Sequence, residues 1–270
     1  MELTAEEVRR RAQSLVDHDF AILRNNYLAE NGMILDSDRA KELFPDYAAS
    51  LTTRRKYSSA VYPPAARFID RLYGQLLQEP LAAGKQGLVV CTAGGPGSGK
   101  SAYMHTAEIA GAIRAAALVL DGTFSDFMRS RRNVDDALKA GFAVHILFVY
   151  RPLEDCLRGV WERAIDPRSG RATPFRTVVE KHRGALETVH RIEVEYQDQM
   201  KVSLLRFRFD GLDRPMLRMS KSELESIPIC DLASSCKLAQ AVLNECERAA
   251  SPNSRDEAQS LRAILAEGLG

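Results

Sequence analysis

The chain has 270 residues, of which 45% are hydrophobic and 27% charged, a composition typical of a globular protein with room for one large α/β domain. Its 37 basic and 36 acidic residues leave a net charge of +1, which argues against a long-range attraction to nucleic acid. The sequence contains no run of about 18 consecutive apolar residues, the length that a membrane-spanning helix needs. Its five cysteines include no C-x-x-C pair, which favours reduced thiols in a cytoplasmic protein, in the producing cell or in a target cell.

The N-terminal part of the chain predicts a helix followed by one short strand. Apolar residues recur at helical spacing over residues 4–27, and Glu7 stands three residues after Thr4 as a capping partner. The apolar residues 33–35 predict a buried strand that ends at Asp36. We therefore expect a helical segment in front of the first strand of the fold.

The rest of the chain alternates helices with strands. The predicted elements are, in order, a helix from Arg39, a long helix opened by Pro63 and Pro64, a strand over 87–92, a helix over 100–115, a strand over 117–121, a helix over 134–140, a strand over 143–150, a helix from Pro152, a strand over 202–209 and helices over 220–270. The strands are apolar without alternation, which predicts a mainly parallel sheet covered by helices on both faces.

Residues 94–101 form a glycine-rich loop between a predicted strand and a predicted helix. Their sequence, GGPGSGKS, matches the phosphate-binding pattern G-x-x-x-x-G-K-[ST] without deviation. Glycines let the backbone curl tightly and bring its N–H groups against phosphate oxygens, and the following helix directs its positive end at the same oxygens. The alternative is a chance glycine-rich turn, and the strand before the loop and the helix after it argue against that alternative.

This P-loop predicts a site for ATP and Mg²⁺. Lys100 is expected to reach the β- and γ-phosphates, and the Ser101 hydroxyl is expected to bind Mg²⁺. The expected nucleotide-binding residues are Gly95, Gly97, Ser98, Gly99, Lys100 and Ser101. We therefore expect an α/β fold of the P-loop NTPase type, with an N-terminal helical segment at 1–30, a kinase core at 31–212 and a helical tail at 213–270.

Two further features lie after the P-loop. Asp121 ends a predicted strand, where it could support the Mg²⁺ shell or accept a hydrogen bond from a substrate hydroxyl. Spacing alone does not choose between these roles and the capping of the next turn. Arg163, Arg168 and Arg171 stand in a segment with Gly and Pro that suits a lid over a triphosphate, although composition alone favours a solvated basic loop.

Taken together, these motifs resemble the zeta toxin family of P-loop kinases. The resemblance rests on GGPGSGKS at 94–101, D-G-T at 121–123, E-R at 162–163, and G-R-A-T-P at 170–174. Residues 183–190, RGALETVH, are similar to the family's helix after the arginine lid. Where many members have an arginine two residues after the D-G-T threonine, this chain has Ser125, so we expect a different acceptor specificity.

The family also has a strand that ends in D-x-D, with a basic residue three positions after the second Asp. This chain has such a block at Asp36 and Asp38, followed by Lys41. In the family the block comes after the P-loop, whereas here it comes before it, so the resemblance implies a permuted order of the same parts. A sheet permits this order, because it depends on which strands are neighbours in space.

The resemblance implies a role for each matching residue. Asp38 would be the general base for the acceptor hydroxyl, although the sequence alone does not distinguish it from Asp36. The implied catalytic residues are Asp38, Lys100, Arg163 and Arg171, the implied substrate-binding residues are Asp121, Thr123 and Lys41, and the implied Mg²⁺ ligands are Ser101 and Asp121.

The resemblance implies transfer of the ATP γ-phosphate to a hydroxyl of a nucleotide-linked substrate, with UDP-N-acetylglucosamine as the first expectation. NAD is an alternative acceptor, because other members of the family act on dinucleotides. An antitoxin, a chaperone or the chain's own terminal helices would restrain a toxic kinase. Two other classes stay open, namely a regulatory ATP-binding module, which would not need Asp38, and a nucleic-acid end kinase, which the balanced charge disfavours. No membrane partner is expected.

Overall fold

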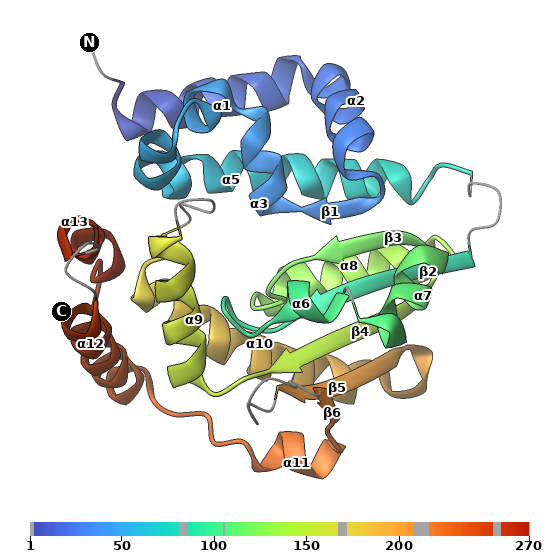
Figure 1. Ribbon diagram of the computed structural model, residues 1–270. Helices are drawn as coiled ribbons and strands as arrows, with labels where there is room; N and C mark the ends of the chain where they lie inside the picture. The colour runs from blue at the N-terminus through green and yellow to red at the C-terminus, as the bar shows by residue number, and fades with distance from the viewer. Residues whose placement is uncertain are drawn as a thin grey trace.

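The protein is built around one six-stranded sheet in the order β1-β3-β2-β4-β5-β6 (Figure 1). The computed structural model describes residues 3–80, 86–104, 106–166, 172–207, 216–250 and 255–269. The strands are β1 (Ile34–Asp36), β2 (Gln86–Ala93), β3 (Ala116–Asp121), β4 (Ala143–Tyr150), β5 (Lys201–Phe207) and β6 (Met216–Arg218). Strands β1 to β5 pair in parallel and β6 pairs antiparallel with β5, so the predicted mainly parallel sheet is confirmed.

Helices precede, connect and follow these strands. They are α1 (Ala5–His18), α2 (Phe20–Asn31), α3 (Ser37–Ala40), the 3-10 helix η1 (Lys41–Leu43), α4 (Pro45–Ala48), α5 (Leu51–Leu76), α6 (Lys100–Met104), α7 (Ala107–Ala115), α8 (Phe127–Lys139), α9 (Leu153–Ile165), α10 (Phe175–Tyr196), the 3-10 helix η2 (Gln197–Gln199), α11 (Lys221–Ser226), α12 (Leu232–Ala249) and α13 (Arg255–Leu265). Within the described residues, no helix is both long and apolar enough to cross a membrane.

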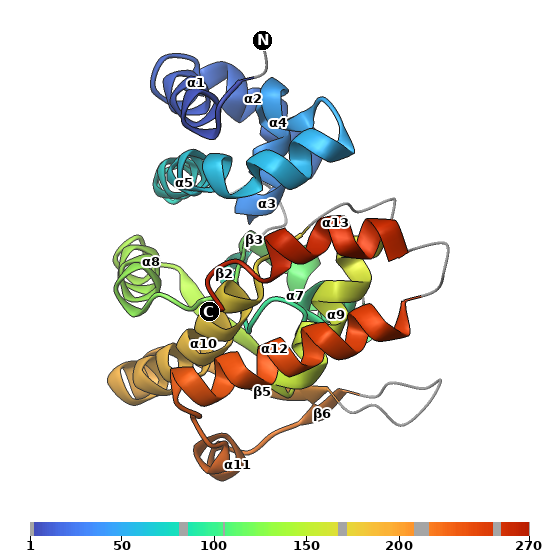
Figure 2. The same ribbon diagram turned by 90° about the vertical axis from the view of Figure 1, so that its left-hand side faces the viewer.

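The sheet has an apolar core on each face, because successive side chains of a strand point to opposite faces. On β4, Val144, Ile146 and Phe148 join the core that includes α5, α8 and α10. The alternating side chains Leu147 and Val149 join a second core with α6 and α7. Figures 1 and 2 show α8 and α10 on one side of the sheet and α6 and α7 on the other. The predicted α/β fold with helices on both faces is therefore confirmed.

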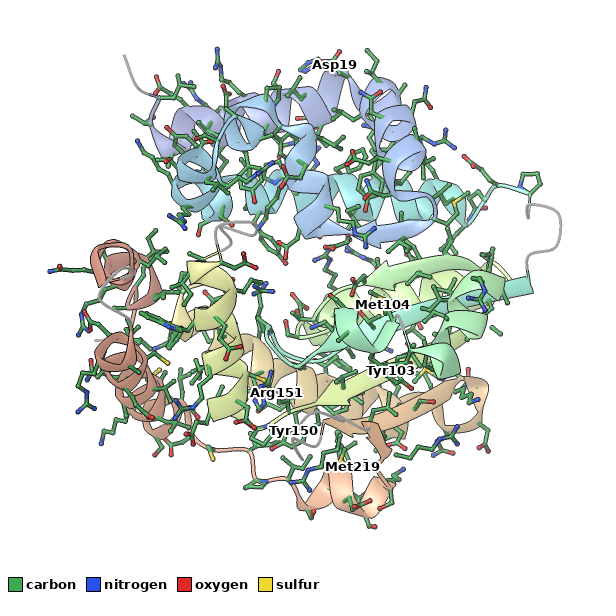
Figure 3. All side chains as sticks on the ribbon, in the orientation of Figure 1. Asp19, Tyr103, Met104, Tyr150, Arg151 and Met219 are labelled. Atoms are coloured by element: carbon green, nitrogen blue, oxygen red, sulfur yellow. The ribbon has the colours of Figure 1, made fainter. Side chains whose placement is uncertain are left out.

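The N-terminal helices differ from the prediction in two places. The predicted helix over 4–27 is two helices, α1 and α2, which meet at Asp19, labelled in Figure 3. The capping box of Thr4 and Glu7 is present, as predicted. The long helix α5 starts after Ser50, which caps it, so the prediction that Pro63 and Pro64 open this helix was wrong. Both prolines lie inside α5, where packing of its apolar face outweighs the loss of two backbone donors.

Two later elements also differ from the prediction. The helix predicted over 100–115 is divided into α6 and α7, with residue 105 outside the described residues. The strand predicted over 202–209 is β5, whose described part ends at Phe207, and β6 beyond it was not predicted. Because β6 is only three residues long, its apolar pattern is too short to be recognised as a strand.

The C-terminal tail packs on the arginine-bearing helix α9. Side chains of α9, α10, α12 and α13 form a separate apolar core that contains Trp161, Phe175 and Leu265, and α12 and α13 both contact α9 (Figure 2). The helical tail predicted over 220–270 is therefore built into the folded protein. It supports the helix that leads into the arginine-rich segment.

Leu265→Ala is expected to lower the free energy of unfolding by about 2–5 kcal/mol, because the Leu265 side chain is 0% exposed in this core. The matched control is Leu238→Ala on α12, where the side chain is 37% exposed and a change within about 0.5 kcal/mol is expected. Urea denaturation measures both values. Equal effects of the two substitutions would show that the tail does not stabilise the protein through this core.

Candidate functional site

The P-loop connects the C-terminal end of β2 with the first residue of α6. Its glycines at 94, 97 and 99 have φ values of 131°, 81° and 93°, which side chains with a Cβ rarely adopt. The Gly94 N–H donates a hydrogen bond to the Thr123 carbonyl at 3.0 Å. This bond fixes the P-loop beside the loop that follows β3, where the predicted substrate-binding residues lie.

The P-loop backbone packs closely against the end of β4 and against α9 and α10. A Cβ on Gly94 would lie 2.4 Å from the Val149 carbonyl oxygen, and a Cβ on Gly97 would lie 2.3 Å from that of Cys156. A Cβ on Gly95 would lie 3.0 Å from the His182 backbone. These glycines are therefore required for close packing as well as for backbone conformation.

Gly97→Ala is expected to destabilise the protein by about 1–3 kcal/mol, because the φ of 81° and the Cys156 carbonyl both exclude a methyl group. Gly74→Ala is the matched control. It lies in α5 with nothing within 4 Å of the added Cβ, so this substitution should stabilise by about 0.4–1 kcal/mol. Thermal unfolding of the two variants gives the comparison, and a stable Gly97→Ala protein would contradict the packing argument.

Lys100 begins α6, and its ammonium lies against the P-loop backbone. The Nζ atom donates hydrogen bonds to the carbonyl oxygens of Gly94 at 2.7 Å and Gly95 at 3.1 Å. Burial lowers the pKa of Lys100, and the carboxylates of Asp121 and Asp36 oppose this change by raising the pKa. Both acidic strand ends are therefore close enough to Lys100 to act on its charge.

The P-loop residues fit a phosphate group. The Ser98 hydroxyl is buried and has no hydrogen-bond partner among the described residues, although a buried hydroxyl is normally paired. It faces the curled backbone, because a Cβ on Gly94 would lie 2.9 Å from its oxygen. The hydroxyl of Ser101 lies on an exposed residue in the first turn of α6. Donors at a helix N-terminus with an adjacent lysine are suited to a polyphosphate.

Asp121 ends β3 directly beside Asp36, which ends β1, because the two residues are partners in the register of these parallel strands. The Thr92 hydroxyl donates a 2.6 Å hydrogen bond to the Asp121 carboxylate and accepts the Gly122 N–H at 3.0 Å. Thr92 on β2 thus holds the carboxylate at the sheet edge next to the P-loop. In the loop beyond, the hydroxyls of Thr123 and Ser125 are 2.9 Å apart.

The D-x-D block forms the start of the short helix α3. The Asp36 carboxylate accepts the Asp38 N–H at 2.7 Å and caps this helix. The Asp38 carboxylate, whose side chain is 45% exposed, pairs with the Lys41 ammonium at 2.8 Å. Lys41 is buried and also donates to the Ser58 hydroxyl at 3.1 Å. Asp36 therefore caps a helix, whereas the Asp38 carboxylate is partly exposed to solvent.

The predicted arginines lie at the C-terminal end of α9. Arg163 is half-buried, and its positive charge contributes to lowering the pKa of Lys100. The Arg55 guanidinium donates to the Ala164 carbonyl at 3.3 Å and ties α5 to this end of α9. Arg168 and Arg171 lie outside the described residues.

Two contributors to the site were not predicted, Thr92 and Arg151. The Arg151 guanidinium donates to the Gly97 carbonyl at 3.0 Å, and its own carbonyl lies 2.8 Å from the His182 ring nitrogen Nε2. Figure 3 shows Tyr150 and Arg151 at the end of β4, beside α9. A polar residue directly after the apolar strand over 143–150 was the available signal for Arg151, because strand ends in such sheets face the ligand.

Comparisons with known proteins give one family match and several similar solved structures. The zeta toxin family model matches residues 113–206, and no curated protein matches the chain. Among solved structures, the chain is similar to the native AvrRxo1-ORF1:-ORF2 complex at 15% identity, with 99% of this chain and 81% of that chain covered and a TM-score of 0.49. The complex with ATP is also 15% identical, with 96% and 75% covered and a TM-score of 0.48.

The matched segment runs from α7 through β3, α8, β4, α9 and α10 into β5, and it contains Asp121, Arg163 and Arg171. The P-loop and the D-x-D block lie before it. The permuted order of those blocks stays a prediction. The match therefore relates residues 113–206 of this P-loop α/β fold to the zeta toxin family.

Proposed function

We propose that this protein transfers the γ-phosphate of ATP to a hydroxyl group of a nucleotide-linked small molecule. The observation that supports this proposal is the meeting of the P-loop with two acidic strand ends, because Asp36 and Asp121 are register partners and both act on the charge of Lys100. A phosphate-binding loop beside carboxylates at a sheet edge supports a site for ATP and Mg²⁺, and Asp38, the proposed base, follows Asp36 by two residues.

In this proposal the P-loop residues bind ATP with Mg²⁺. The backbone N–H groups of Gly95, Gly97 and Gly99 and the Ser98 hydroxyl would contact phosphate oxygens, and Lys100 would contact the β- and γ-phosphates. Ser101 and Asp121 would hold Mg²⁺, which neutralises charge on the phosphates when bound. The buried Ser98 hydroxyl, which has no hydrogen-bond partner among the described residues, most directly favours phosphate binding by the P-loop.

Asp38 is the proposed general base. Its carboxylate would take the proton of the acceptor hydroxyl as the hydroxyl oxygen forms a bond to the γ-phosphorus and the bond to the ADP oxygen breaks. The Asp36 cap fixes the backbone of Asp38, and the Lys41 ammonium pairs with its carboxylate. Arg163, with Arg171 from the segment outside the described residues, would stabilise charge on the transferred group, while Asp121, Thr123 and Lys41 would contact the acceptor.

UDP-N-acetylglucosamine is the first acceptor that we propose, and NAD is the second. This preference rests on the resemblance to the zeta toxin family, as does the proposed restraint by an antitoxin or chaperone. The helices α1 and α2 could also restrain the enzyme, because they pack against α5, whose Ser58 contacts Lys41.

The test is incubation of the purified protein with ATP labelled at the γ-phosphate and with UDP-N-acetylglucosamine, NAD or an oligonucleotide. Label on either nucleotide-linked compound is the expected result. Label on the oligonucleotide would instead identify a nucleic-acid end kinase. Label released only as free phosphate, at a rate that Asp38→Asn leaves unchanged, would identify a regulatory ATP-binding module and contradict the proposed transfer.

A further inference from the structure

Three cationic side chains from three different elements lie near the Tyr62 side chain in α5. The Lys41 Nζ atom lies 5.4 Å from the ring centroid, and the Lys181 Nζ atom of α10 lies 4.4 Å from it. The Arg129 guanidinium of α8 is close enough to the Tyr62 hydroxyl for the two groups to interact electrostatically. We call Lys41, Tyr62, Arg129 and Lys181 the Tyr62 cluster. Residues far apart in the sequence thus build one positively charged position.

The Tyr62 cluster lies beside the proposed catalytic residues. Lys41 pairs directly with the Asp38 carboxylate at 2.8 Å. His182, which follows Lys181 in α10, packs so closely on the P-loop that a Cβ on Gly95 would lie 3.0 Å from its backbone. The cluster is therefore connected to the proposed base on one side and to the P-loop on the other.

The charges of the Tyr62 cluster are not balanced. Lys41 has Asp38 as its partner, and Arg129 has Asp70 at 2.8 Å. Among the described residues, the interaction shown for Lys181 is its contact with the Tyr62 ring, with no carboxylate paired to it. Two ammonium groups held near one ring repel each other, and an anion placed between them would remove that repulsion.

The Tyr62 hydroxyl adds a hydrogen-bond donor to this position. A guanidinium has no acceptor, so the nearby Arg129 cannot accept the hydroxyl proton of Tyr62. Among the described residues, no hydrogen bond donated by the Tyr62 hydroxyl is present. Ammonium and hydroxyl donors that converge in this way match the oxygens of a phosphate group.

We infer that Lys181, together with Lys41 and the Tyr62 hydroxyl, binds a phosphate group of the acceptor. UDP-N-acetylglucosamine and NAD, the acceptors proposed above, both carry a diphosphate that this position would bind. This inference rests on the proposed function, because it assigns the second substrate of the same site. It adds Lys181 and Tyr62 to the substrate-binding residues.

Equilibrium binding tests this inference apart from catalysis. UDP-N-acetylglucosamine and NAD are titrated separately by calorimetry into protein whose P-loop is saturated with Mg²⁺ and the non-hydrolysable analogue AMP-PNP. At least one compound should bind, and Lys181→Ala and Lys181→Gln should weaken that binding about 10- to 100-fold, the loss expected for a charge-assisted hydrogen bond. Tyr62→Phe should weaken it about 2- to 10-fold. The compound whose affinity falls in the Lys181 variants is the one whose diphosphate binds at this position.

Lys237→Ala is the matched control, because Lys237 is an exposed lysine of α12 and its loss removes the same charge elsewhere. Unchanged binding in Lys181→Gln and in Tyr62→Phe, or binding of neither compound to the unsubstituted protein, would overturn the inference. Binding that depends on Lys181 without any phosphoryl transfer would support the anion site and contradict the proposed kinase activity. Phosphoryl transfer to an acceptor whose binding is independent of Lys181 would support the kinase activity and contradict the anion site.

Discussion

Lys100→Ala is expected to reduce kcat/KM for phosphoryl transfer by about 10³ or more. The reason is that the Lys100 ammonium is the cation that α6 holds directly at the P-loop backbone, within 3.1 Å of the Gly94 and Gly95 carbonyl oxygens. Charge that develops on the transferred phosphoryl group would lose its nearest fixed counter-charge. Initial rates with labelled ATP and the acceptor that takes up label in the transfer experiment measure this loss.

The same substitution is expected to leave the protein folded. Burial lowers the pKa of Lys100, which means that the fold gains nothing from holding this charge out of water. The thermal midpoint of Lys100→Ala should therefore equal or exceed that of the unsubstituted protein. If Lys100→Ala is unfolded, Lys100 has a structural role. If it is folded and has normal turnover, Lys100 does not take part in phosphate binding.

Asp38→Asn is expected to lower kcat by about 10²–10⁴ while the KM for ATP changes little. Asparagine has the same shape as aspartate and cannot take a proton from the acceptor hydroxyl. The Lys41 ammonium keeps the Ser58 hydroxyl as a partner, so the local fold should survive the loss of the ion pair. Single-turnover rates with saturating ATP separate this chemical effect from binding.

Asp36→Asn is the matched comparison for the assignment of the base. An asparagine at 36 can still accept the Asp38 N–H through its side-chain oxygen and keep the cap of α3. It loses the charge that acts on Lys100 and that pairs with Arg39 at 3.8 Å, so its kcat should fall less than that of Asp38→Asn. The opposite ranking, with Asp36→Asn nearly inactive and Asp38→Asn active, would assign the base to Asp36.

The sequence determined the P-loop, the strand before it and the parallel sheet. A phosphate-binding loop is encoded locally, because the φ values at glycines 94, 97 and 99 depend on the absence of a Cβ at each position. The apolar strands are equally local signals, and the bounds of β4 agree with the predicted 143–150. The ends of helices were less predictable: Pro63 and Pro64 resemble a helix start, and only the packing of α5 shows that the helix runs through them.

Only the tertiary structure decided which side chains share the site. The register that places Asp36 beside Asp121, the Arg151 contact with Gly97 and the convergence of Lys41 and Lys181 on Tyr62 join residues from distant parts of the chain. Motif spacing reports backbone conformation over a few residues, whereas these contacts depend on how helices pack across a sheet. That packing is set by the summed burial of many apolar side chains, so no local pattern contains it.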